Sequence, residues 1–127
     1  WMPFACSILA EREADYVVNP KRLDAPYMIL TFETTDRVDD IAAGTHPSDG
    51  TCRPQIVRRD WNTDYWELIR AFEARTGIGA VLNTSFNLHG YPIVNTATEA
   101  LDVMRRSGLK YLILGPYWVE KKGPDCS

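Results

Sequence analysis

The fold of this chain is indicated most clearly by residues 78–87, which read IGAVLNTSFN. An apolar run that ends in short hydroxyl and amide side chains is typical of a buried strand whose end offers hydrogen-bond donors at a sheet edge. Ligands of α/β folds bind at such edges. Two interpretations stay open here: a pocket for a polar ligand, or a turn in which Asn and Ser satisfy loop backbone groups.

Strands and turns account for much of the remaining pattern. Residues 41–46 and 52–57 flank the turn-forming sequence PSDG, which predicts a β-hairpin around Asp49 and Gly50. Other strand-like apolar runs occupy residues 4–9, 27–32, 78–82, 111–114 and 117–120.

Two helices are predicted by their caps. Asn62 or Thr63 can cap the first helix, and Gly77 follows its last turn. Its apolar positions recur at helical spacing and are Tyr65, Leu68, Ile69 and Phe72.

The second helix has a capping-box spacing between Thr96 and Glu99. Gly108 stands where a left-handed residue would end this helix. Alternating strands and helices, with antiparallel pairing from the early hairpin, predict an α/β sandwich built on a mixed sheet.

The composition fits one globular domain over residues 1–127, because 45% of the residues are hydrophobic and 24% are charged. A net charge of -3 provides no basic field for nucleic acid or an anionic membrane. No apolar run approaches the ~18 residues of a membrane span, so we expect a soluble protein. The chain opens with Trp1 and enters an apolar run at Phe4, which suggests a domain cut from a longer polypeptide.

The three cysteines are Cys6, Cys52 and Cys126, and they show neither a CxxC motif nor a Cys/His ligand spacing. This pattern argues against a zinc site and a disulfide scaffold, and it favours a reducing, cytoplasmic setting. With only two histidines, we expect this chain to bind no metal.

Arg53 is the strongest candidate for binding an anion. It follows the predicted turn, with Thr51 on the same strand face and His46 near the end of the facing strand. A guanidinium offers a fork of donors that matches phosphate or carboxylate oxygens. The alternative is an ordinary solvated surface arginine or an ion pair.

A catalytic triad of His46, Asp49 and Ser85 is disfavoured. Ser85 lacks a GxSxG context, and the other two residues are too close in sequence for a typical orienting pair. A GxxxxGK[ST] phosphate loop is also absent, so any nucleotide must be held in another way.

Several motifs together give the chain a family resemblance. In order they are residues 3–11 (PFACSILAE), 45–46 (TH), 49–55 (DGTCRPQ), 71–77 (AFEARTG), 82–87 (LNTSFN), 92–94 (PIV) and 107–115 (SGLKYLILG). With this combination the chain resembles the C-terminal region of the NodU/CmcH family of O-carbamoyltransferases, almost from end to end.

The resemblance implies a YrdC-like α/β (α+β) domain, a twisted mixed β-sheet with packed helices. It also implies a partner, an N-terminal ASKHA-like domain of the same polypeptide that holds Fe. In this family the YrdC-like part uses ATP, with Mg, and carbamoyl phosphate to make carbamoyl-adenylate. The partner domain then passes the carbamoyl group to a hydroxyl of a small-molecule acceptor.

By the same resemblance, Arg53 is expected to contact phosphate, and Ser85 to contact the nucleotide or phosphate without acting as a nucleophile. Supporting roles fall to His46 and Thr51 beside Arg53, and to Asn83, Thr84 and Asn87 in shaping the loop. The chain departs from the family pattern at Met2, Cys6 and Tyr91. The basic motif of such a phosphate site would lie upstream of Trp1, so we expect only part of the anion site here.

Two other interpretations stay open. The chain as it stands could be a non-catalytic module that binds a nucleotide or packs against its partner domain. A weaker alternative is a hydrolase that uses Ser85 without ATP.

Overall fold

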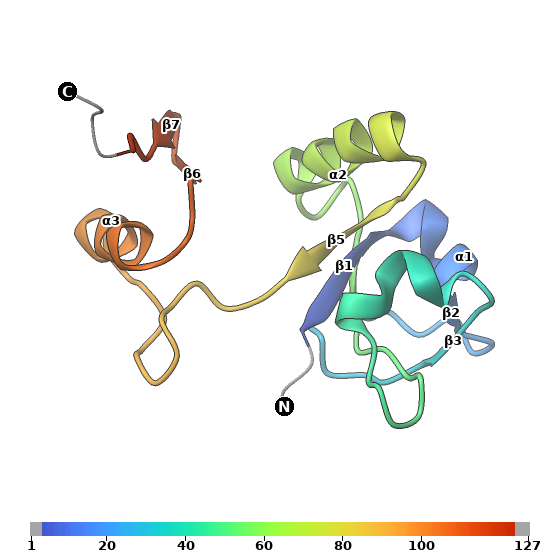
Figure 1. Cartoon of the computed structure of the whole chain (residues 1–127). Coiled ribbons are helices and arrows are strands. Elements are labelled where there is room, and N and C mark those ends of the chain that lie inside the picture. The colour runs from blue at the N-terminus through green and yellow to red at the C-terminus, as the bar shows by residue number, and fades with distance from the viewer. Residues whose placement is uncertain (1–3, 124–127) are drawn as a thin grey trace. The chain divides into compact units, whose positions relative to one another are not determined.

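The structure is a computed structural model that describes residues 4–123. Trp1, Met2, Pro3 and Cys126, on which some of the predictions rest, lie outside the described residues. The chain forms two compact units, Trp1–Thr84 and Ser85–Ser127, which are described separately (Figure 1).

The first unit is built on a three-stranded sheet. Its central strand, β1 (Ala5–Leu9), lies between β4 (Gln55–Val57), which is parallel to it, and β5 (Ala80–Asn83), which is antiparallel. The predicted mixed sheet and the strands expected at residues 4–9 and 78–82 are therefore confirmed, with boundaries shifted by one or two residues. The antiparallel pairing, however, comes from β5 and not from the early hairpin.

The two faces of the sheet carry different cores. On one face, Cys6 and Ile8 of β1 belong to a cluster of buried side chains, the others being Tyr16, Val17, Ala25, Phe32, Ile41, Cys52, Ile56 and Ala80. On the opposite face, Leu9 and Val57 pack with Ile69 of the helix α2 (Thr63–Thr76). This division follows from the alternation of side chains along β1.

Helix α2 begins and ends as predicted. The Asn62 side chain accepts a hydrogen bond from the Tyr65 N–H at 3.2 Å, and Gly77 adopts the left-handed conformation with φ 77°. The predicted apolar stripe is only partly correct, because Ile69 is fully buried whereas Leu68 and Phe72 are 47% and 40% exposed. Glu73, which the predicted stripe did not include, is buried as well.

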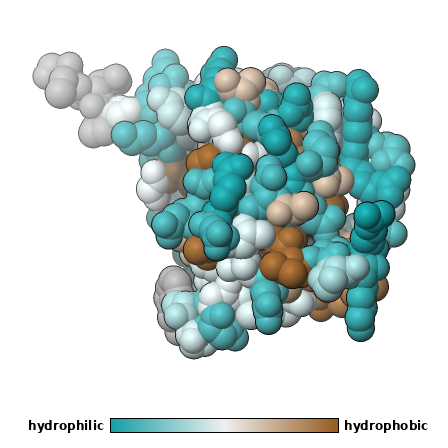
Figure 2. Space-filling model, turned by 90° about the vertical axis from the view of Figure 1, so that its right-hand side faces the viewer, coloured by the Kyte–Doolittle hydropathy of each residue, from teal (hydrophilic) through white to brown (hydrophobic). Residues whose placement is uncertain are grey.

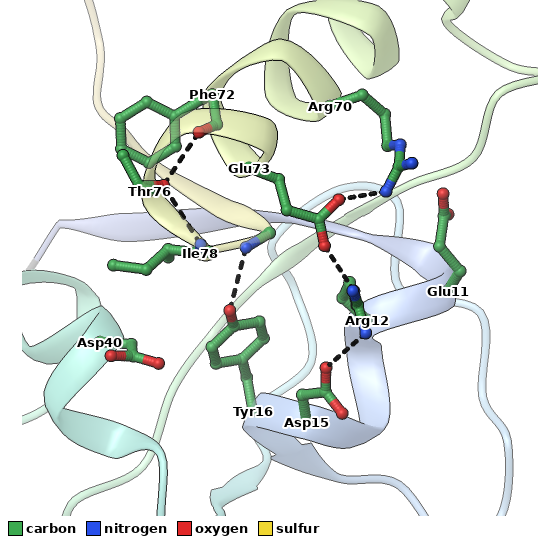
Figure 3. Close-up of polar contacts among 12 residues, drawn as sticks. Glu11, Arg12, Asp15, Tyr16, Asp40, Arg70, Phe72, Glu73, Thr76 and Ile78 are labelled. Carbon is green, nitrogen blue, oxygen red and sulfur yellow. Dashed lines mark hydrogen bonds and ion pairs between the residues drawn. The ribbon is translucent and has the colours of Figure 1, made fainter.

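Two arginines neutralise the buried carboxylate of Glu73 (Figure 3). Arg70 pairs with it from the same helix, and Arg12 Nε lies 2.5 Å from Glu73 Oε1. Arg12 belongs to the 3-10 turn η1 (Ala10–Arg12), which leads into α1 (Glu13–Tyr16). The Glu73 carboxylate raises the pKa of Arg12, so the pair fastens α2 to the turn that follows β1.

The start of β5 is tied to the same region. The buried hydroxyl of Tyr16 accepts a hydrogen bond from the Gly79 N–H at 3.0 Å. A Cβ atom on Gly79 would lie 2.7 Å from Arg12 Cγ, so a larger residue would push against the arginine that holds Glu73. The chain therefore needs a glycine at this close approach.

The predicted hairpin of residues 41–57 is wrong in its arms and right in its turn. Residues 41–44 belong to the 3-10 segment η2 (Val38–Gly44), and Gln55–Val57 pairs with β1 instead. Only a bridge between Thr45 and Cys52 remains, closed by a hydrogen bond from the His46 N–H to the Thr51 carbonyl at 2.7 Å. Gly50 takes the expected positive φ of 68°.

A strand at residues 27–32 was also predicted and is largely absent. Met28 has a φ of 56°, which interrupts extended backbone. Phe32 forms a single bridge to Cys52, and the short strand β3 (Glu33–Thr34) then pairs with β2 (Val17–Val18).

Within residues 85–123, the second unit contains a helix and two strands at the predicted positions, and the two strands pair with each other as a hairpin. The helix α3 (Ala97–Arg106) begins with a complete capping box between Thr96 and Glu99. The strands β6 (Tyr111–Leu114) and β7 (Tyr117–Glu120) form an antiparallel pair, with Gly115 at a φ of 58° in the turn.

The predicted left-handed cap at Gly108 is not formed, since Gly108 is not among the residues with positive φ. Instead, the ammonium group of Lys121 donates hydrogen bonds to the carbonyls of Met104, Arg105 and Ser107 at 2.9–3.2 Å. A cation at the carboxyl end of α3 satisfies the last carbonyls and opposes the negative end of the helix dipole. Lys121 lies far along the chain from the end of α3, so the sequence alone does not indicate that it caps this helix.

The face of the molecule shown in Figure 2 is mainly hydrophilic, with small, separate hydrophobic areas. Within residues 4–123, none of the helices combines the length and the apolar character that spanning a membrane would require.

We predict that Ile69→Ala lowers the free energy of unfolding by about 2–5 kcal/mol, because it empties the centre of the contact between α2 and the sheet. Leu68→Ala, at the neighbouring and half-exposed position, should cost less than about 1 kcal/mol. Urea denaturation followed by circular dichroism measures both, and equal losses would contradict this packing.

Candidate functional site

Three polar side chains, one from each strand, form a hydrogen-bonded cluster at one end of the central sheet. Ser7 Oγ donates to Gln55 Oε1 at 2.8 Å, and Asn83 Nδ2 donates to both Ser7 Oγ and Gln55 Oε1 at 2.9 and 3.0 Å. The strand register places Ser7 directly opposite Gln55 and Asn83 opposite Ala5. The cluster therefore fixes the beginning of β4 and the end of β5, the two chain segments that lead to the candidate residues.

Ser7 and Gln55 were not predicted as part of a site. Their signal was present, because each is a polar residue in an otherwise apolar strand segment and lies within one of the family motifs. Ser7 is fully buried, so its hydroxyl needs the partners that it finds in Gln55 and Asn83.

The turn before Arg53 is organised by Asp49. One carboxylate oxygen, Asp49 Oδ1, accepts from both the backbone N–H and the hydroxyl of Thr51, at 2.9 and 2.8 Å. These hydrogen bonds lower the pKa of Asp49 because they stabilise its charged form. His46 Nδ1 is hydrogen-bonded to Ser48 Oγ at 2.7 Å and lies 3.7 Å from Asp49 Oδ1. The side chains of His46 and Thr51 therefore form their hydrogen bonds with other residues of the turn that leads to Arg53.

Arg53 extends from a firmly held stretch of backbone. Its neighbours Cys52 and Pro54 are both almost completely buried, whereas Arg53 itself is exposed. Within residues 4–123, no carboxylate lies within ion-pair distance of Arg53. In this range Arg22, Arg75 and Arg105 likewise have no carboxylate partner, whereas partners are present for Arg12, Arg37, Arg58, Arg59, Arg70 and Arg106. A guanidinium on a fixed backbone, without a protein partner in this range, is suited to an anionic ligand.

In the second unit, Asn87 shapes the loop that begins at Ser85. Ser85 Oγ donates to Asn87 Oδ1 at 2.7 Å, and Asn87 Nδ2 donates to the carbonyls of Leu88 and Tyr91 at 3.1 and 2.8 Å. The amide of Asn87 thus holds the turn closed and orients the hydroxyl of Ser85 at the same time.

The candidate residues fall into two groups. His46, Thr51, Arg53, Asn83 and Thr84 belong to the first unit, and Ser85 and Asn87 belong to the second. The boundary lies inside the predicted LNTSFN motif, between the exposed residues Thr84 and Ser85.

The titratable side chains of residues 4–123 include no group of three or more His, Cys, Asp or Glu residues that could hold a metal ion. The candidate site residues offer positive charge from Arg53, and hydrogen bonding from Arg53, Ser85 and the amide side chains.

Comparison with known proteins gives this arrangement a context. The family model described as "Carbamoyltransferase C-terminus" matches residues 1–121. The chain belongs to this family. Its relatives include an uncharacterized protein of Methanocaldococcus jannaschii, which is 36% identical over 95% of the chain. The nodulation protein NolNO of Sinorhizobium fredii is 34% identical over 96% of it.

A further member of the family, from Amycolatopsis lactamdurans, is named 3'-hydroxymethylcephem-O-carbamoyltransferase and is 31% identical over 76% of the chain. The chain spans only 23%, 18% and 18% of the lengths of these three relatives, in the order given. These shares, together with the description of the family as a C-terminus, are consistent with the C-terminal domain of a larger polypeptide.

We predict that Thr51→Val raises the pKa of Asp49 toward its ordinary value of 3.8, because the substitution removes the hydroxyl donor. A depressed pKa stabilises the folded state above the ordinary value, and this contribution is lost as the pH falls through the folded-state pKa. NMR titration of the Asp49 carboxyl carbon measures the effect. An identical pKa in both proteins would contradict the role given to Thr51.

Proposed function

We propose that this chain is the YrdC-like C-terminal domain of an O-carbamoyltransferase, and that it binds ATP and carbamoyl phosphate and forms carbamoyl-adenylate. The carbamoyl group then passes to a hydroxyl of a small-molecule acceptor in an N-terminal ASKHA-like domain. The observation that carries the proposal is the exposed Arg53 on its fixed backbone, in a chain of this family. The name of the Amycolatopsis relative supports transfer to oxygen.

The role proposed for Arg53 follows from charge. Carbamoyl phosphate and ATP are both polyanions, and a guanidinium can contact two phosphate oxygens at once. Buried Cys52 and Pro54 restrict the backbone on either side, so binding of an anion has to order only the arginine side chain and not its backbone. The hydrogen-bonded turn at Asp49, which comes just before Cys52 in the chain, holds the same stretch of backbone in place.

Ser85 and Asn87 are proposed to bind the reacting groups. With its proton donated to Asn87 Oδ1, Ser85 Oγ presents lone pairs, which suit the N–H donors of a carbamoyl group. Rotation of the hydroxyl would let Ser85 donate to a phosphate oxygen. The bond to Asn87 involves no histidine or other general base, so the hydrolase with Ser85 as nucleophile is not proposed.

The proposed reaction is balanced when carbamoyl phosphate, ATP and water give carbamoyl-adenylate, pyrophosphate and inorganic phosphate. In this scheme the protein stabilises charge on phosphate oxygens with fixed donors and needs no covalent intermediate. Mg²⁺ would enter with ATP, and Fe would belong to the N-terminal domain, as the family resemblance implies.

The second candidate function is a non-catalytic module that binds a nucleotide or packs against the partner domain. It is favoured by the exposed apolar side chains on one face of the β6–β7 hairpin. Tyr111, Ile113 and Trp118 are 53%, 60% and 64% exposed, and the rings of Tyr111 and Trp118 lie 5.2 Å apart.

We predict that Arg53→Ala weakens carbamoyl phosphate binding by about 1.5–3 kcal/mol, the scale of a hydrogen bond to a charged group. Isothermal titration calorimetry measures the change. The matched control is Arg59→Ala, which removes another exposed arginine from the same unit and should leave the affinity unchanged. Equal affinities for the parent protein and Arg53→Ala would remove Arg53 from the site.

We predict that Ser85→Ala lowers the rate of pyrophosphate release from ATP about 10- to 150-fold, as expected for loss of one hydrogen bond to a charged group. Loss of a nucleophile would reduce the rate by about 10⁴-fold or more. A loss of that size, or release of carbamate without ATP that Ser85→Ala abolishes, would contradict the binding role.

A further inference from the structure

Two amide side chains of the polar cluster each keep one polar group free. Gln55 Oε1 accepts hydrogen bonds from Ser7 Oγ at 2.8 Å and from Asn83 Nδ2 at 3.0 Å, and Asn83 Nδ2 also donates to Ser7 Oγ at 2.9 Å. The other halves of the two amides, Gln55 Nε2 and Asn83 Oδ1, form no hydrogen bond within residues 4–123. The cluster therefore offers one free donor and one free acceptor, on two side chains that are bonded to each other.

The cluster also fixes the orientation of these two free groups. Ser7 is fully buried, and Gln55 and Asn83 are both half-buried. Turning the Gln55 amide over would set its N–H donors against the N–H donors of Asn83, and the bond between the two amides would be lost. Side chains that are held in this way bind a ligand without the entropic cost of being ordered first.

The free donor of Gln55 lies close to Arg53 along the chain and is reached from solvent. Gln55 follows Arg53 by two residues, so their Cα atoms are at most about 7 Å apart. Gln55 also lines a cleft of about 220 Å³, together with Tyr27, Trp61 and Tyr65 among others. Tyr27 and Trp61 are 74% and 50% exposed, so the cleft opens to solvent. A small molecule can therefore reach the Gln55 side chain.

A carbamoyl group is the chemical complement of this pair of amides. Its carbonyl oxygen accepts hydrogen bonds and its NH₂ group donates them, and both are attached to the same carbon atom. We infer that Gln55 Nε2 donates to the carbonyl oxygen of a bound carbamoyl group and that Asn83 Oδ1 accepts from its NH₂ group. The NH₂ group carries two hydrogens, so one is left for Ser85. This inference rests on the proposed function, because it assigns the uncharged half of carbamoyl phosphate, whose phosphate half is assigned to Arg53.

Such a subsite selects carbamoyl phosphate from other acyl phosphates. Acetyl phosphate has nearly the same shape but carries a methyl group in place of the NH₂ group. It would leave Asn83 Oδ1 without a donor at a position that the bound ligand shields from water. A site whose polar groups lose their partners rejects a ligand even when its shape fits. Gln55 and Asn83 thus determine which acyl group is bound, and Arg53 binds the phosphate.

Calorimetry with carbamoyl phosphate, acetyl phosphate and inorganic phosphate tests the inference, on the longest polypeptide in which residues 1–127 occur. The parent protein should bind carbamoyl phosphate about tenfold or more tightly than acetyl phosphate. Asn83→Leu, which keeps the size of the side chain and removes its polar groups, should lose this preference and still bind inorganic phosphate as the parent does. An undiminished preference in this variant, or equal weakening of all three ligands as from a purely structural role, would overturn the inference.

Gln55→Glu removes the free donor alone, because the carboxylate still offers an acceptor to Ser7 and Asn83. Binding of carbamoyl phosphate should weaken about tenfold or more relative to inorganic phosphate, which controls for the added negative charge. Acetyl phosphate should lose as much, since it has the same carbonyl oxygen. The matched control is Asn95→Leu, at an exposed asparagine outside the cluster, and it should leave all three affinities unchanged.

The result for the subsite can be told apart from the result for the proposed function. Suppose that carbamoyl phosphate binds and that Arg53→Ala weakens its binding, but that Asn83→Leu keeps the preference and Gln55→Glu weakens all ligands alike. The subsite would then be wrong and the proposed function would stand. A parent protein that does not bind carbamoyl phosphate would contradict both.

Discussion

Burial of strand β1 is the constraint on which the rest of the first unit depends. All five of its residues are buried, and both of its edges are hydrogen-bonded, to β4 and to β5. Because side chains alternate along a strand, one face must accept Cys6 and Ile8, and the other Ser7 and Leu9. A polar residue buried at this centre requires partners, and Ser7 finds them in Gln55 and Asn83. The burial of β1 and the hydrogen bonds of Ser7 thus determine both the register of the sheet and the position of the candidate site.

Two charged side chains of the first unit, Glu73 and Arg53, lie in opposite environments. Glu73 is buried and shared between Arg12 and Arg70, so its charge is compensated and serves to join α2 to the turn after β1. Arg53 is exposed and lacks a carboxylate partner within residues 4–123, although Cys52 and Pro54 hold its backbone on both sides. A buried charge that is neutralised by ion pairs typically has a structural role. An arginine that has no ion-pair partner and stands on a rigid backbone is suited to binding a ligand.

Sequence reasoning succeeded where the signal was local. The two caps of α2 and the amino-terminal cap of α3 depend on neighbouring residues, and they were predicted correctly. It failed where a distant partner decided the outcome: residues 55–57 pair with β1 rather than with residues 41–46, and Lys121 replaces a glycine cap at α3. For the candidate site, Arg53 and Ser85 could be proposed from motifs. The roles of Gln55 and Ser7 could not, because they arise from the strand register.

The central claim is that this domain makes carbamoyl-adenylate, and exchange of labelled pyrophosphate into ATP tests it most directly. The measurement is made on the longest polypeptide in which residues 1–127 occur, with the Arg53→Ala variant beside it. The account predicts exchange that requires carbamoyl phosphate and falls at least tenfold in Arg53→Ala. Release of phosphate from carbamoyl phosphate with no exchange of pyrophosphate into ATP would contradict it.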